Sequence, residues 1–181
     1  MKHMRNKKKM TKEVTKAVAK ETTTKNVTEL VFILDRSGSM GGLDAIGGAI
    51  HHIGNVHKYA REEDRPDKTL FIIATDGMEN ASRRYTYDKV KEMVERQKST
   101  YGWEFLFLGA NIDAIEVAGR FGIAADRAVN FECDSKGTQL NYQVLGETVS
   151  LMRSCSAREV SERLGSAWKG KIEKDYQKRH R

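Results

Sequence analysis

Two short apolar segments, each leading into an aspartate, constrain this chain more than any other feature of its sequence. Residues 30–34 read LVFIL and precede Asp35, while residues 70–74 read LFIIA and precede Thr75 and Asp76. Short, continuous apolar runs of this kind are typical of strands buried on both faces of a parallel sheet. Open α/β sheets bind ligands beyond the carboxyl ends of their strands, so we expect functional residues at positions 35 and 76.

The remaining periodicity predicts strands that alternate with helices. Strands are expected at 29–34, 69–75, 104–108 and 128–131. Apolar residues spaced three and four apart predict helices that start near 43, 86, 112, 134 and 157 and end near 60, 100, 121, 152 and 168. This alternation favours an α/β fold, a Rossmann-like, doubly wound and mostly parallel sheet of about four strands with carboxyl-terminal helices.

Charge and composition divide the chain into three parts. Its 181 residues are 39% hydrophobic, enough for one ordinary domain. Residues 1–25 hold nine Lys and Arg against two Glu, which accounts for the whole net charge of +7. We expect residues 1–27 to be a basic, disordered tail or a frayed helix with Met10, Val14 and Val18 on one face. Residues 28–132 would form the α/β domain, and 133–181 a helical extension whose basic end, 166–181, is a solvated tail.

Several classes of protein are not indicated. No run approaches the roughly 18 apolar residues of a membrane span, and no secretion signal follows the basic start, so we expect a cytoplasmic protein without a membrane partner. Cys133 and Cys155 have no metal-binding or redox spacing and are expected to be reduced thiols. Residues 37–41 and 42–49 come close to a nucleophile elbow and a phosphate-binding loop but lack required residues, so no enzyme is predicted.

The two aspartates form part of a candidate metal site. Asp35, Ser37 and Ser39 alternate just past the first predicted strand, and Asp76 follows the second. All four offer hard oxygen donors, which suit Mg²⁺, Mn²⁺ or Ca²⁺ rather than zinc. Two carboxylates that share a cation also avoid their mutual repulsion. For Asp76, a plain Asp-Gly turn remains an equally good interpretation.

These residues carry a resemblance to a known family. The sequence DRSGSM at 35–40, followed by TDG at 75–77, resembles the metal-ion-dependent adhesion site (MIDAS) of von Willebrand factor type A (vWA) domains, and residues 101–111 resemble a later strand of bacterial cytoplasmic members. The similarity covers about 28–131. It implies that Ser37 and Ser39 bind the metal directly, that Asp35 and Asp76 bind it directly or through water, and that a partner's carboxylate completes the coordination.

The chain departs from this family in one place. Only residues 40–42 separate the first motif from the next predicted helix, where family members carry further elements and a metal-binding Thr. The chain therefore resembles an internally shortened member with an incomplete, weaker site, in which Asp44 could substitute for the Thr.

The helix that would cover the other side of the first strand is also missing. That face would be bare unless the carboxyl-terminal helices or a second copy covered it.

Three functions follow as hypotheses. The resemblance implies a non-enzymatic, divalent-cation-dependent protein-binding module whose partner presents an acidic residue, such as an adaptor to an ATPase or a chaperone-like assembly. The second is a metal-free structural or interaction scaffold. The third, which we expect least, is association with nucleic acid through the basic ends.

Overall fold

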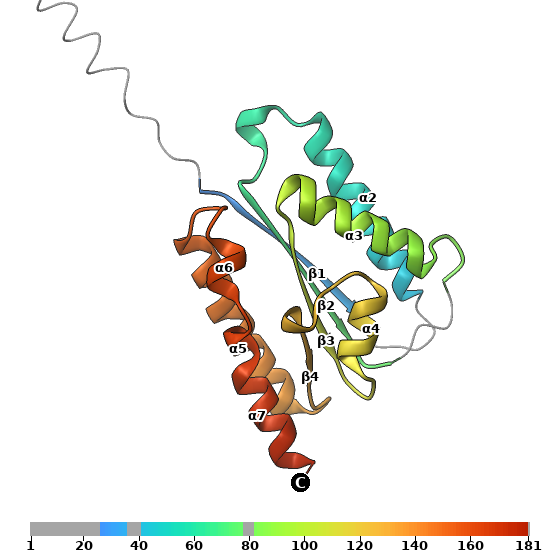
Figure 1. Ribbon diagram of the computed structural model, residues 1–181, viewed down its shortest axis with the longest axis vertical. Helices are drawn as coiled ribbons and strands as arrows, with labels where there is room; N and C mark the ends of the chain where they lie inside the picture. The colour runs from blue at the N-terminus through green and yellow to red at the C-terminus, as the bar shows by residue number, and fades with distance from the viewer. Residues whose placement is uncertain (1–25, 36–40, 78–81, 181) are drawn as a thin grey trace, which may run out of the picture.

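The protein is a parallel sheet with helices on both faces. The computed structural model describes residues 26–35, 41–77 and 82–180. The strands are β1 (Thr28–Asp35), β2 (Lys68–Thr75), β3 (Glu104–Gly109) and β4 (Ala128–Asn130). Helices α2 (Gly42–Tyr59), α3 (Tyr87–Tyr101) and α4 (Ala114–Arg120) cover one face, and α5 (Ser135–Ser154), α6 (Val160–Leu164) and α7 (Gly170–Arg179) lie on the other (Figure 1). The predicted Rossmann-like, doubly wound α/β fold is confirmed.

All strand pairs are parallel, in the order β1-β2-β3-β4. The register pairs Asp35 with Thr75 and Thr75 with Gly109, so three strands end at one edge of the sheet. We call this edge the carboxyl rim. β1 lies at the side of the sheet and is not buried on both faces, contrary to the first expectation for this segment.

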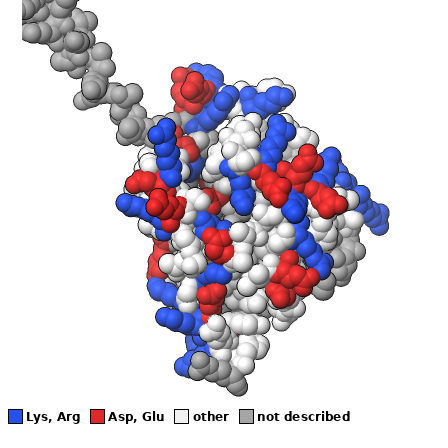
Figure 2. All heavy atoms as spheres, viewed as in Figure 1, with Lys and Arg blue, Asp and Glu red and all other residues white. Residues whose placement is uncertain are grey.

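The basic carboxyl-terminal residues belong to the fold. The predicted helix to residue 168 ends at Leu164, because Gly165 takes a positive φ of 46°, and α7 follows. Trp168 and Ile172 are only 8% and 2% exposed. The prediction of a solvated tail was therefore wrong, although the four-residue spacing of Val160, Leu164, Trp168 and Ile172 indicates the buried face. Basic and acidic side chains are interspersed on the face shown in Figure 2.

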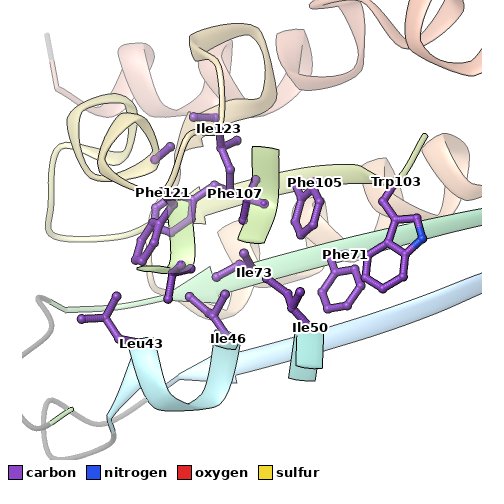
Figure 3. Packing of buried hydrophobic residues seen from close by; sticks show 14 of the residues in the cluster. Leu43, Ile46, Ile50, Phe71, Ile73, Trp103, Phe105, Phe107, Phe121 and Ile123 are labelled. Atoms are coloured by element: carbon purple, nitrogen blue, oxygen red, sulfur yellow. The ribbon is translucent and has the colours of Figure 1, made fainter. Parts of the chain in front are cut away.

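Alternate residues of β2 and β3 enter two cores. Phe71, Phe105 and Trp103 form a stack of rings on the side of α2 and α3, with centroids 5.1 and 5.2 Å apart (Figure 3). Leu70, Ile72, Leu106 and Leu108 face α5 to α7 instead. Each of these strands therefore packs against the helices on both faces of the sheet. This packing holds the carboxyl end of the strand in place.

Buried cations fasten the carboxyl-terminal helices to the sheet. Lys68 Nζ donates to the Met152 and Cys155 carbonyls at the end of α5, both at 2.7 Å. Arg127 bonds Glu104 and the Ser161 and Gly165 carbonyls around α6. The Met152 and Ser161 carbonyls also accept the N–H groups of Cys155 and Gly165, so the two cations reinforce the carboxyl ends of α5 and α6 and join them to the sheet.

Candidate functional site

The two aspartates of the candidate site belong to adjacent strand ends. Asp35 is the last residue of β1 and pairs in register with Thr75, which Asp76 follows directly. Their backbones therefore meet at the carboxyl rim, as the sequence predicted for two neighbouring parallel strands. Asp76 is half-buried. Ser37 and Ser39 lie outside the described residues, as does the side chain of Asp35.

The turn after β2 is held by local hydrogen bonds. The Thr75 hydroxyl accepts from the Gly77 N–H at 3.4 Å and donates to the Gly77 carbonyl at 3.1 Å. Asn111, in the left-handed region at φ 58°, donates from Nδ2 to the Asp76 carbonyl at 3.5 Å. These contacts tie the backbone around Asp76 to the ends of two strands.

Asp44 has a structural role at this rim. Its carboxylate accepts the backbone N–H groups of Arg83, Arg84 and Tyr85 at 3.0, 2.8 and 2.9 Å. In return, the Ser82 hydroxyl accepts the Asp44 N–H at 3.1 Å, which satisfies one of the free amides in the first turn of α2. The amino end of α2 and residues 82–85 thus cap each other.

These hydrogen bonds change the acidity of Asp44. The backbone N–H of Arg83 has the largest effect and lowers the pKa of Asp44 from the usual 3.8. Burial opposes it, and the N–H groups of Arg84 and Tyr85 lower the pKa further. Since both carboxylate oxygens already accept these amides, Asp44 is poorly suited to the metal-binding role that the sequence analysis suggested for it.

The predicted donor set combines carboxylates with hydroxyls, which suits a hard cation. Within 26–35, 41–77 and 82–180, no three His, Cys, Asp or Glu side chains gather where they could hold a metal ion together. Two carboxylates at adjacent strand ends, joined by hydroxyls, suit Mg²⁺, Mn²⁺ or Ca²⁺. The candidate donors are therefore the four predicted from the sequence, Asp35, Ser37, Ser39 and Asp76, of which the structure describes the side chain of Asp76.

An apolar pocket adjoins the rim on the side of α5. Phe32 and Leu34 of β1, Asp76, and Asn141 and Tyr142 of α5 contribute to its wall. Asn141 is 7% exposed, and its Oδ1 has no hydrogen-bond partner among the described residues. The sequence analysis did not identify Asn141, because a single amide within a helical pattern carries no local signal.

Comparisons were made with protein-family models, curated proteins and solved structures. None of the three found a match. Among the described helices, none has the length and apolar character needed to cross a membrane.

Proposed function

We propose that this chain is a non-enzymatic protein-binding module of the vWA type that uses a divalent cation, Mg²⁺ or the similar Mn²⁺ or Ca²⁺. The observation that carries the proposal is the register of β1 and β2, which brings the first residues of the two motifs, Asp35 of DRSGSM and Thr75 of TDG, to one rim. The proposed ligands are Asp35, Ser37, Ser39 and Asp76.

The chemistry of these ligands suits recognition of an acidic partner. Ser37 and Ser39 are neutral, so a bound cation keeps much of its charge and attracts a further carboxylate. The partner would be a protein that presents an Asp or Glu at its surface. Asp35 and Asp76 would hold the cation, while the Thr75 and Asn111 contacts keep the turn at Asp76 in place.

The affinity for the cation is expected to be low. No Thr corresponds to the family's third hydroxyl ligand, and the Asp44 carboxylate is occupied by three amides. Water would have to occupy the coordination position that the Thr takes in the family. Unlike a side chain, this water is not held in place by the protein before the cation binds.

A metal-free scaffold is the second candidate. It is favoured by the reciprocal contacts of Asp44 with residues 82–85, because these hydrogen bonds hold this part of the rim together within the protein. A surface arranged in this way could bind a protein partner without a cation.

Calorimetric titration of Mg²⁺ and Mn²⁺ into the purified chain separates the two candidates. We expect saturable binding that Asp35→Ala weakens by at least about tenfold, or ~1.4 kcal/mol, and that Asp88→Asn, at an exposed acid of α3, leaves unchanged. Equal binding by both variants would place the cation elsewhere. No binding by a folded chain would reject the metal-dependent function and favour the scaffold.

A further inference from the structure

The apolar pocket beside the carboxyl rim has the size and position of a small-molecule site. It encloses about 100 Å³ between the sheet and the amino-terminal half of α5. Its apolar wall consists of Phe32, Leu34, Ala74, Leu108, Phe131 and Leu145. Parallel sheets bind ligands beyond the carboxyl ends of their strands, where this pocket lies. Since an apolar cavity of roughly 150 Å³ holds benzene, this one suits a compact body of about five carbon atoms.

A buried hydrogen-bond acceptor also lines the pocket. Asn141 is only 7% exposed, and its Oδ1 has no partner among the residues that the structure describes. Buried polar atoms in proteins are nearly always paired, because leaving one unpaired costs free energy. A ligand that brings an N–H or O–H group into the pocket would satisfy Asn141.

The charge of the pocket selects among such ligands. Asp76 lines it, and within the described part of the chain its carboxylate forms no ion pair. None of the described lining residues is Lys, Arg or His. An uncompensated carboxylate attracts a positive ligand and repels an anion, all the more so beside an apolar wall.

Aromatic rings from three segments favour the same charge. Phe32 comes from β1, Phe131 from the residues after β4, and Tyr142 from α5. Organic cations are attracted to the faces of aromatic rings, and proteins use groups of such rings to recognise ammonium ligands. The pocket therefore combines aromatic rings, a carboxylate and an unpaired acceptor.

We propose that this pocket binds a small organic ammonium ion that carries at least one N–H group. Its apolar body lies against Phe32, Leu34 and Leu145, its N–H donates to Asn141 Oδ1, and its charge is balanced by Asp76. This binding site goes beyond the cation-dependent function proposed above and does not require it. A divalent cation held by Asp76 would compete with the ammonium group for the same carboxylate.

Three probes with a common branched aliphatic body test the site on the full chain. Isopentylamine is positive at pH 7, isopentyl alcohol is a neutral donor, and isovalerate is negative. Chemical-shift titrations in the presence of EDTA measure their affinities. We expect isopentylamine to bind saturably at millimolar concentrations and at least about tenfold more tightly than the alcohol, whereas isovalerate should not saturate.

Two substitutions separate the charge from the acceptor. Asp76→Asn should lower the affinity for isopentylamine to that for the alcohol. Asn141→Leu should weaken both ligands about fivefold without lowering the Tm, because it removes an unpaired buried acceptor. Asp88→Asn and Gln143→Leu, at exposed residues outside the pocket, should leave all affinities unchanged.

The assignment is overturned if isopentylamine does not bind saturably, or if its shifts map away from the pocket. It is also overturned if the alcohol or isovalerate binds as tightly as the amine, or if Asp76→Asn or Asn141→Leu retains the full affinity for the amine. The comparison of the three probes uses the unaltered chain, so it requires no variant to fold. Because EDTA removes divalent cations, the result is independent of whether the chain binds Mg²⁺.

Discussion

Asp44 shows how one side chain can organise the rim of a sheet. It accepts three consecutive backbone amides from residues 83–85, and these lower its pKa below the usual 3.8. A group with a lowered pKa in the folded state stabilises the fold above its unfolded pKa, and this contribution is lost as the pH falls through the folded value.

We therefore predict that Asp44→Asn lowers the Tm at pH 7. The difference in Tm between the variant and the unaltered protein should become smaller below about pH 4. Thermal unfolding between pH 7 and pH 3 measures this difference. Asp88→Asn is the control, because it removes an exposed carboxylate that lacks these three contacts. A Tm difference between the two proteins that stays constant down to pH 3 would show that the charge of Asp44 does not stabilise the fold.

The sequence identified Asp44 as a candidate near the site but assigned it a different role. Its amide partners come from a loop about 40 residues later in the chain, and backbone donors have no signature in a sequence. Asp35 and Asp76 were easier to place, because parallel strands of similar length that pair side by side end at the same rim.

Among the elements, α2 depends on glycine for its contact with the loop before α3. A Cβ built on Gly47 would lie 2.4 Å from a ring carbon of Tyr85, whereas one on Gly48 would meet nothing within 4 Å. The ring of Tyr85 can thus approach the helix backbone only where no side chain intervenes.

The two glycines provide a matched pair of substitutions. Gly48→Ala should stabilise the protein by about 0.5–1 kcal/mol, because alanine favours the helix. Gly47→Ala should destabilise it by about 1–3 kcal/mol through overpacking against Tyr85. Denaturant unfolding measures both values, and equal effects would mean that the loop moves aside without cost.

The elements themselves were mostly predictable. Thr86, where the sequence predicted a helix to start, caps α3 by accepting the Lys89 N–H, and Gly102 ends the helix with a φ of 66°. These signals lie within a few residues of each helix end. α7 was missed, because its lysines and arginines outweighed the single buried Ile172 in the sequence pattern.

On the scale of the whole molecule, the sheet joins both helical layers. β2 supplies Phe71 and Ile73 to one core and Leu70 and Ile72 to the other. Lys68 and Arg127 add buried contacts from the sheet region to α5 and α6. Neither layer can detach without exposing apolar surface of the same strands.

We accordingly predict that residues 28–132 and 133–181 unfold together, although the sequence analysis treated them as separate parts. Calorimetry of the full chain should give one transition, with a calorimetric enthalpy equal to the van't Hoff enthalpy. A separate, earlier transition that removes only α5 to α7 would contradict this view of the core.

The sequence by itself determined the alternation of strands and helices, the parallel sheet and the convergence of Asp35 and Asp76 at one rim. These properties follow from the periodicity of neighbouring residues and from short connections between elements. Only the tertiary structure decided that Asp44 binds the loop at 83–85, that α7 contributes to the core and that the described helices leave Leu30, Phe32 and Leu34 exposed. Each of these depends on segments far apart in the chain, whose distances are set only when the whole fold has packed.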